Sequence, residues 1–218
     1  MPRIDGREVV LDVILVTHVS LAVVLVDSYT NAGAIGRAQV LLRELSQVGR
    51  LNPSGYFLFL NIPDGIYTLH VESEHYLDEE VVLSVPASPP EHLLVTIFLQ
   101  PRPSYPFPPG ATLIRGLVHD AVDNPIANAR VDIVGRNIAS FSVQSGEFVF
   151  PFAALREQDV IRVNRKTFVK GNGDRNELTS PPTPPTLITV RATHPSYGTV
   201  TTTTEVQEGT TAFVRLVY

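Results

Sequence analysis

Apolar and polar positions alternate every second residue in stretches that recur along this chain. Residues 67–73 read Tyr-Thr-Leu-His-Val-Glu-Ser, and residues 187–193 read Leu-Ile-Thr-Val-Arg-Ala-Thr. A period of two is typical of a strand with one buried face, and β-branched residues favour that state. The pattern therefore predicts an all-β protein, with one short helix at 154–159 and a strand at 160–163.

The chain repeats itself at an offset of 91 residues. Ala38–Val40 and Ser54–Phe57 have their counterparts in Ala129–Val131 and Ser145–Phe148. A shared offset of this kind indicates two copies of one β-rich unit, each of about 100 residues, a size at which a single core is stable. Six apolar residues at equivalent points are expected to be buried: Val40, Phe57, Leu69, Val131, Phe148 and Val190.

Differences between the two copies give the expected domain organisation. An N-terminal strand extension covers 1–18, the first module 19–100, a Pro-rich linker 101–110, and the second module 111–218 with an insertion at 153–186. Five prolines in the ten linker residues predict a stiff, extended spacer. A functional alternative is that Tyr105 and Phe107 form an aromatic strip that packs on a neighbour.

Several short motifs mark turns and core anchors in both copies. They are Asn124–Val131 (Asn-Pro-Ile-Ala-Asn-Ala-Arg-Val), Ser145–Phe148, Pro63–Tyr67, and the paired Tyr76 and Tyr197. In these motifs the chain resembles the carboxypeptidase regulatory-like family, whose modules are transthyretin-like sandwiches. The resemblance implies two tandem immunoglobulin-like or transthyretin-like Greek-key β-sandwich modules. It carries over no zinc ligand and no activity, because the peptidase domain that names the family is absent.

Composition and charge limit the partners. Hydrophobic residues make up 44% and charged residues 18% of the 218 residues, as in globular proteins, and there is no cysteine. The net charge of −5 divides into −7 over residues 1–100 and +2 over residues 101–218. Nucleic-acid affinity depends on Lys and Arg at phosphates, so the acidic first half speaks against such binding, and no nucleic-acid partner is expected for the chain.

The chemistry of an enzyme or a metal centre is not found in the sequence. The six histidines show no ligand spacing, and no nucleophile motif or phosphate-binding loop occurs. The acidic run from Glu72 to Glu80 is interpreted as a solvated edge, with Ca²⁺ binding as the less favoured alternative. We therefore expect no enzymatic activity and no cofactor.

Two further segments are candidates for partner binding. The apolar run before the first module predicts an added strand at a sheet edge, either in its own module or in a partner. The insertion carries a basic cluster that fits an acidic partner or phosphate, or is simply a solvated loop. With the linker aromatics, the candidate residues are Val9, Val10, Leu11, Val13, Ile14, Leu15, Tyr105, Phe107, Arg162, Arg165, Lys166 and Lys170.

These features favour a non-enzymatic structural or adaptor subunit that assembles with other protein subunits, for example in a phage-tail-like or contractile-injection particle. The alternative is a surface adhesin or carbohydrate-binding module. The run from Val9 to Val26 contains polar residues and is preceded by the acids Asp5 and Glu8, where a signal peptide would be basic, so neither a signal peptide nor a membrane span is expected. The expected location is cytoplasmic or within a leaderless, virion-like particle.

Overall fold

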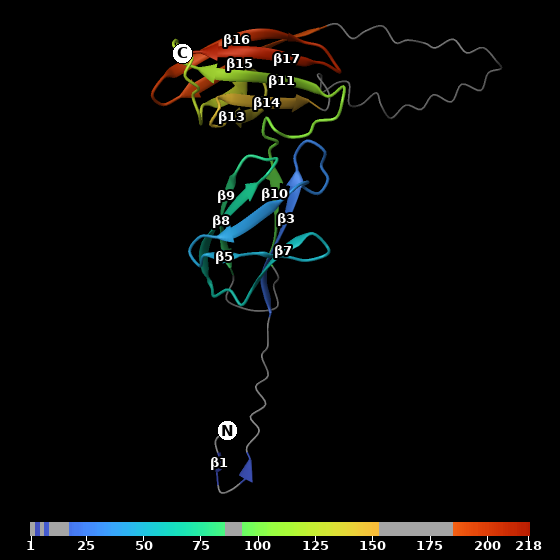
Figure 1. The fold of residues 1–218 in the computed structure, drawn as a ribbon, viewed down its shortest axis with the longest axis vertical. Helices are drawn as coiled ribbons and strands as arrows, with labels where there is room; N and C mark the ends of the chain where they lie inside the picture. Colours follow the sequence, from blue (N-terminus) through green and yellow to red (C-terminus); the bar gives the residue numbers. More distant parts are fainter. Residues whose placement is uncertain (1–2, 5–6, 9–17, 86–92, 153–184) are drawn as a thin grey trace, which may run out of the picture. The chain divides into compact units, whose positions relative to one another are not determined.

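The structure, a computed structural model, describes residues 3–4, 7–8, 18–85, 93–152 and 185–218 (Figure 1). Every regular element in these ranges is a β-strand. No helix in them is long and apolar enough to cross a membrane. The helix predicted at 154–159 and the strand predicted at 160–163 lie outside the described residues.

The described residues form seventeen strands. Their bounds are β1 Arg3–Ile4, β2 Arg7–Glu8, β3 Val19–Asp27, β4 Ala38–Leu42, β5 Gln47–Val48, β6 Arg50–Leu51, β7 Tyr56–Leu60, β8 Gly65–Ser73, β9 Glu79–Val85, β10 Leu93–Leu99, β11 Thr112–His119, β12 Arg130–Ile133, β13 Ala139–Phe141, β14 Glu147–Phe152, β15 Thr186–His194, β16 Gly198–Val206 and β17 Thr211–Val217.

The sheets show the same strand order twice. The first module has sheets β10-β3-β7-β6 and β5-β4-β8-β9, and the second has β14-β11-β17 and β13-β12-β15-β16, while β1 and β2 pair separately. In each module the first strand lies between the last strand and the strand after the Ser-Gly turn. The expectation of two tandem Greek-key β-sandwiches is therefore confirmed.

The first and last strands of the second module are neighbours and run parallel. β11 pairs with β17 from Leu113 opposite Thr211 to His119 opposite Val217. On its other side β11 pairs antiparallel with β14, with Gly116 opposite Phe148. Since β11 has a partner on both sides, β14 and β17 form the two edges of this sheet among the described residues.

All six residues expected in the two cores are buried. In the second module Phe148 packs over Gly116, where an added Cβ would lie 2.4 Å from the Phe148 ring and 2.7 Å from Val214. The glycine leaves the space that the aromatic ring fills. In the first module the residue opposite Phe57 is Val23, which is also buried.

By their packing the described residues divide into two compact units, which we call unit 1 and unit 2. Unit 1 lies within Met1–Leu25, Gln39–Val71 and Glu79–Ile97, and unit 2 within Val26–Ala38, Glu72–Asp78 and Phe98–Tyr218. The division differs from the boundaries at 100 and 111 expected from the sequence. Two loops of the first repeat, within Val26–Ala38 and Glu72–Asp78, belong to unit 2 together with the linker. The hydrogen bonds described below join them.

The acidic run from Glu72 to Glu80 includes a side chain that is paired with neighbouring basic groups. Glu80 makes an ion pair with Arg43 and lies 3.3 Å from His70 Nδ1. No group of three or more His, Cys, Asp or Glu side chains in the described residues is placed to hold a metal ion.

Candidate functional site

A carboxylate with no exposed surface lies in unit 2, at the end of β3. Asp27 follows the alternating strand and begins a turn, and its Oδ1 accepts the backbone N–H groups of Tyr29 at 2.7 Å and Thr30 at 3.3 Å. Its Oδ2 accepts the hydroxyl groups of Tyr105 at 2.5 Å and Tyr76 at 3.2 Å. Four donors thus satisfy one buried carboxylate, as its removal from water requires.

The two tyrosines that bind Asp27 act as hydrogen-bond donors. Burial first, and then the hydrogen bond to Asp27, raise the pKa of Tyr105. Burial also raises the pKa of Tyr76, although the backbone N–H of Ile35 that donates to its hydroxyl acts in the opposite direction. Both phenols keep their protons, and every oxygen of the group is already bonded. This arrangement is suited to fixing the fold and not to acid–base chemistry.

The linker carries one of these tyrosines, and its structure differs from the expected extended spacer. Backbone bonds from Tyr105 N–H to Arg102 O and from Phe107 N–H to Tyr105 O, each 2.9 Å, bend the chain into turns. Tyr105 is only 6% exposed, so the expectation that it presents a surface to a neighbour is wrong for this residue. Hydrogen bonding to Asp27 gives it a partner within unit 2.

Phe107 also has contacts within unit 2. Its ring lies 5.4 Å from Tyr29 and 4.6 Å from Tyr105, and the guanidinium of Arg115 is 5.6 Å from its centre. Arg115 in addition donates to the carbonyl of Pro103 at 2.9 Å. The linker is therefore attached by aromatic and cation–π contacts, which are favourable when the cation sits over a ring face.

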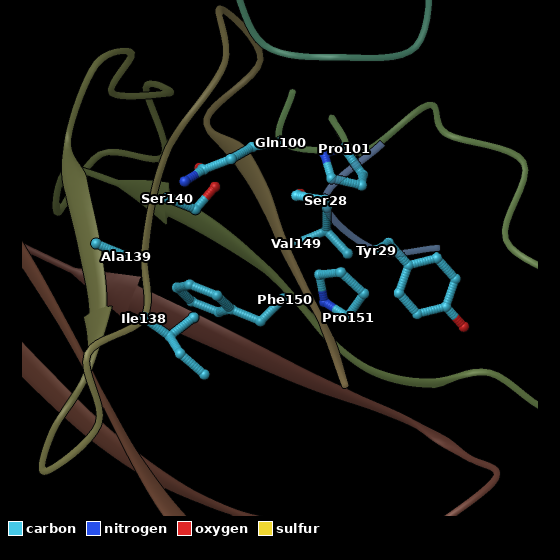
Figure 2. Close-up of a pocket in the computed structure, with 10 residues that line it drawn as sticks. All are labelled: Ser28, Tyr29, Gln100, Pro101, Ile138, Ala139, Ser140, Val149, Phe150 and Pro151. Carbon is cyan, nitrogen blue, oxygen red and sulfur yellow. The ribbon is translucent and has the colours of Figure 1, made fainter. Parts of the chain in front are cut away.

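A pocket of about 280 Å³ lies beside this aromatic cluster in unit 2 (Figure 2). Its wall is mostly apolar. The polar side chains among its lining residues are those of Gln100, Ser28 and Ser140, together with the hydroxyl of Tyr29. The residues drawn in the figure are Ser28, Tyr29, Gln100, Pro101, Ile138, Ala139, Ser140, Val149, Phe150 and Pro151. No charged group lines it, so it offers shape and few directed bonds to a ligand.

A second pocket of unit 2, of about 290 Å³, is more polar. Arg102, Asn128 and Gln144 contribute to its wall, and Arg102 donates to Asp78 at 3.2 Å. Phe141 is 49% exposed at the same pocket. An exposed ring beside amide and guanidinium groups is a combination that suits a sugar, because sugars present both apolar faces and hydroxyl groups.

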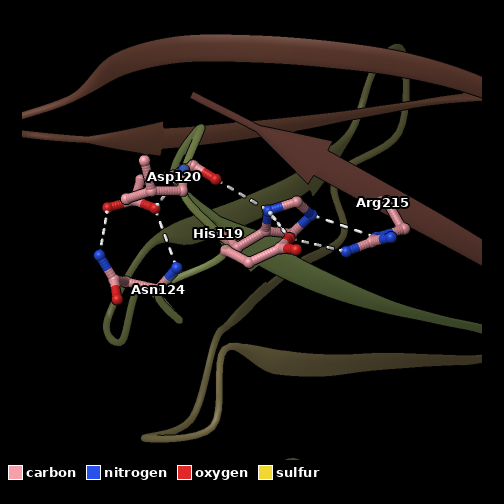
Figure 3. Close-up of polar contacts among 6 residues, drawn as sticks. His119, Asp120, Asn124 and Arg215 are labelled. Carbon is pink, nitrogen blue, oxygen red and sulfur yellow. Dashed lines mark hydrogen bonds and ion pairs between the residues drawn. The ribbon is translucent and has the colours of Figure 1, made fainter.

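A polar cluster lies at the end of β11 and β17 (Figure 3). Arg215 Nε donates to Nε2 of His119 at 3.2 Å, and Arg215 Nη2 donates to Asp123 at 3.0 Å. Since Nε2 accepts a hydrogen bond, it carries no proton, so the imidazole proton is on Nδ1. Nδ1 lies 3.0 Å from the carbonyl oxygen of Asp120 and 3.2 Å from a carboxylate oxygen of Asp123. Two hydrogen bonds thus orient the exposed Arg215 guanidinium.

The loop beneath this cluster is closed by an aspartate turn. Asp120 Oδ1 accepts the backbone N–H groups of Val122 and Asn124, both at 2.9 Å, and Oδ2 accepts Asn124 Nδ2 at 2.9 Å. These hydrogen bonds, the side-chain bond from Asn124 first, lower the pKa of Asp120. The turn gives Asp123 a backbone φ of +65°, a conformation that Asp tolerates better than most residues.

Apolar side chains extend from this cluster along the outer face of the sheet. Phe213 is 77% exposed on β17, and Val217 and Leu117 are exposed beside it. A pocket of about 250 Å³ adjoins them and includes His119 and Arg215. We call Leu117, Phe213, Arg215 and Val217 the β17 face. It combines a large exposed aromatic ring with a cation that is hydrogen-bonded to His119 and Asp123.

Most of the partner-binding residues expected from the sequence lie outside the described residues: Val9, Val10, Leu11, Val13, Ile14, Leu15, Arg162, Arg165, Lys166 and Lys170. Sequence reasoning missed the β17 face. Its signal is the run Phe213-Val-Arg-Leu-Val217, in which large apolar residues occupy both faces of a strand. A strand with one solvated face has polar residues at alternate positions, so this departure predicts an unusually apolar exposed face.

Comparisons with known proteins give the following similarities. The chain aligns over 91% of its length with 34% of the Bacillus anthracis TIE protein, at 14% identity and a TM-score of 0.33. It aligns over 92% of its length with 62% of a Streptococcal ancillary pilin, at 15% identity and a TM-score of 0.28. The chain thus spans less than two thirds of either protein.

A third solved structure is covered almost completely. It is the shaft pilin spaA from Lactobacillus rhamnosus GG, of which the alignment covers 96%, together with 90% of this chain, at 9% identity and a TM-score of 0.27. No protein-family model and no curated protein matches the sequence.

Proposed function

We propose that this chain is a non-enzymatic structural subunit that acts through protein–protein contacts in a larger assembly. The observation that carries the proposal is that each module ends in an edge strand with large exposed apolar side chains. Leu94 and Phe98 on β10 are each 56% exposed, and Phe213 on β17 is 77% exposed. Exposed apolar edge strands are sites at which other chains add, and soluble proteins normally blunt them.

The hydrogen bonding of two polar clusters supports the same proposal. Asp27 and its two tyrosines are bonded to one another, and His119 and Arg215 support a surface. None of these sets places an activated nucleophile beside a base, which covalent catalysis requires. The two modules are proposed to be carboxypeptidase regulatory-like domains of the non-catalytic kind, on the turn and anchor motifs that both copies carry.

Sedimentation velocity of the purified full chain over a range of concentrations tests the assembly role. The expected result is association that increases with concentration, or a high-mass complex when the chain is isolated with its native partners. A chain that remains monomeric, and that also co-purifies with no other subunit, would contradict the proposal. A phage-tail-like or contractile-injection particle is the proposed setting, and electron microscopy of the native complex tests it.

A second candidate function is glycan binding, favoured by the polar pocket with Phe141 and Arg102. The test is a glycan array probed with the full chain and with Phe141→Ala. Binding that disappears in Phe141→Ala while the melting temperature is unchanged would establish this function. Binding that persists in the variant would place any glycan site elsewhere.

A further inference from the structure

The open edge of β17 offers backbone hydrogen-bonding groups. On its other side β17 is bonded to β11. The hydrogen bonds at the two ends of this pairing run from Leu113 N–H to Thr210 O and from Tyr218 N–H to His119 O, both 3.0 Å. In a parallel ladder alternate residues of a strand turn their N–H and C=O groups toward one neighbour. The even-numbered residues of β17 therefore bond β11, and Thr211, Phe213, Arg215 and Val217 direct their backbone groups to the edge. No further strand pairs with them among the described residues.

The same residues of β17 give the edge a recognisable side-chain pattern. On the outer face the order is apolar, cationic, apolar: Phe213, Arg215, Val217. His119 and Asp123 each accept one N–H of Arg215, and a guanidinium has five N–H donors. A positioned guanidinium with donors to spare suits a carboxylate on a strand added beside it, because that pair can form two parallel hydrogen bonds.

One segment of this chain has the complementary pattern. Residues 9–16 read Val-Val-Leu-Asp-Val-Ile-Leu-Val, in which Asp12 is the only charge. As a strand, this segment would present Val10, Asp12 and Ile14 on one face. Placed beside β17, Asp12 meets Arg215 while its two neighbours meet Phe213 and Val217. A buried carboxylate needs such a partner, so the position of Asp12 restricts where the segment can bind.

Residues 9–16 cannot all join, as one strand that extends to Val16, the sheet of the first module that contains β3. β3 already has β10 on one side and β7 on the other. Two hydrogen bonds fix His18 beside Asn61: the Asn61 backbone N–H donates to the His18 carbonyl at 3.1 Å, and the His18 backbone N–H donates to Asn61 Oδ1 at 3.2 Å. From His18 to Val16 the chain spans at most about 7.6 Å, because consecutive Cα atoms are about 3.8 Å apart. A strand added outside β10 or β7 would lie two strand spacings, about 9.6 Å, from β3, which is farther than Val16 can reach from His18.

The other edge strands fit the segment less well than β17. The exposed charges on β9, β14 and β16 are acidic, at Glu80, Glu147 and Glu205, and would repel Asp12. The outward residues of β10 are Leu94, Thr96 and Phe98, which leave a carboxylate without a cation. β6 exposes Arg50 but is only two residues long. Among the described edges, β17 alone combines length, apolar side chains and a cation.

We propose that residues 9–16 of one copy add as a strand to the β17 edge of a second copy, with Asp12 paired to Arg215. The donor segment and the acceptor edge are separate parts of the chain. Each copy can therefore donate to one neighbour and accept from another, and a heterologous contact of this kind builds rings or open filaments. The inference rests on the proposed function and names the partner and the contact.

A charge exchange on the full chain tests the proposal, with sedimentation velocity as the readout. Asp12→Lys and Arg215→Glu should each weaken self-association by about tenfold or more, the effect of breaking one interfacial charge pair. The double variant should recover most of the loss. In an equimolar mixture of the two single variants both contacts between unlike chains are matched, Asp12 with Arg215 and the introduced lysine with the introduced glutamate, so the mixture should associate. Arg50→Glu, on an edge strand of the other module, is the matched control and should leave association unchanged.

A second measurement covers the case in which Arg215→Glu does not fold. A labelled peptide of residues 6–18 should bind the full chain carrying Asp12→Lys, whose own segment no longer competes, and Phe213→Thr in that background should weaken the binding. A full chain that self-associates with the same affinity in all charge variants would contradict this contact and leave the structural role standing. A peptide that binds equally with and without Phe213→Thr would also overturn it.

Discussion

An aspartate closes the turn at the end of the first strand in each module, but the side chains that bind the two aspartates differ. Asp27 and Asp120 each accept two backbone N–H groups of the turn that follows. The turns include Asn31 and Asp123, at φ values of +55° and +65°. Asp27 is completely buried beneath Tyr76 and Tyr105, whereas the second oxygen of Asp120 is bonded by its neighbour Asn124 in an exposed loop.

The comparison separates a local requirement from a tertiary one. An aspartate that follows a strand closes the turn through its own backbone bonds, and both copies do so. Burial of Asp27 adds a second requirement, because a carboxylate removed from water needs donors from elsewhere. The donors come from residues 49 and 78 positions away. This need explains why two loops of the first repeat and the linker pack together in unit 2.

Removing each aspartate gives the largest expected contrast. Asp27→Ala leaves two buried phenol groups and two turn amides without an acceptor, so it should lower the free energy of unfolding by about 3 kcal/mol or more. Asp120→Ala should cost much less, because water can replace the lost bonds in an exposed loop. Urea unfolding followed by circular dichroism measures both. Equal losses would show that burial of Asp27 adds nothing.

The residue opposite the core phenylalanine tests whether the modules share one packing scheme. Gly116→Val places in the second module the residue that the first module has as Val23. The new side chain would collide with the Phe148 ring and Val214, at a cost of about 3 kcal/mol. Val23→Ile, a volume change at the equivalent site, is the reference. If Gly116→Val unfolds at the same urea concentration as the natural chain, the two cores are interchangeable at this point.

Tyr105→Phe isolates the contribution of the linker to the first turn. The substitution keeps the ring and removes one donor to a buried carboxylate, so a loss of about 1.5 kcal/mol is expected. Tyr29→Phe, on a neighbouring ring with no hydroxyl bond to Asp27, should change the free energy of unfolding little. A thermal melt of both variants makes the comparison, and an unchanged melting temperature for Tyr105→Phe would contradict the linker's role.

The two Ser-Gly turns should differ in tolerance to a side chain. Gly55 and Gly146 both have positive φ, at +85° and +76°. An added Cβ at Gly55 meets no atom within 4 Å, but at Gly146 it would lie 2.5 Å from the carbonyl oxygen of Val118. Gly55→Ala should therefore cost about 1 kcal/mol from backbone strain alone, and Gly146→Ala more. Equal costs in urea unfolding would exclude the close approach at Gly146.

High pH should lower the stability contributed by the Asp27 turn, and low pH the stability contributed by the Asp120 turn. These are the smallest effects that we expect. The pKa of Tyr105 is raised above its ordinary value of 10, so its contribution to stability is present below pH 10 and is lost as pH rises further. The pKa of Asp120 is lowered from 3.8, so its contribution is present above pH 3.8 and is lost as pH falls through the lowered value. Melting temperatures of Tyr105→Phe and Asp120→Asn, measured across pH, check both effects. Tyr105→Phe should reduce only the loss of stability at high pH, and Asp120→Asn only the loss at low pH.

The sequence predicted the repeated architecture because strand spacing and turn residues are local properties. Val40, Phe57, Phe148 and Val190 are buried as expected, and the matching sheet orders follow from the shared offset. The linker was predicted wrongly from its prolines alone. Proline content favours an extended chain in isolation, but the hydroxyl of Tyr105 binds a buried carboxylate distant in sequence and bends the linker around it.

The alternation of residues and the 91-residue repeat by themselves determined two tandem β-sandwiches, their turns and their cores. Only the tertiary structure decided which strands lie at sheet edges, and so which apolar residues stay exposed. Phe213 and Val214 are adjacent residues of similar apolar character, yet one is exposed and the other buried. Adjacent residues of a strand point to opposite faces, and packing of one face against the other sheet buries Val214 and leaves Phe213 exposed. Strand order sets which edge lacks a neighbour, and pairing between distant strands cannot be read from either strand alone.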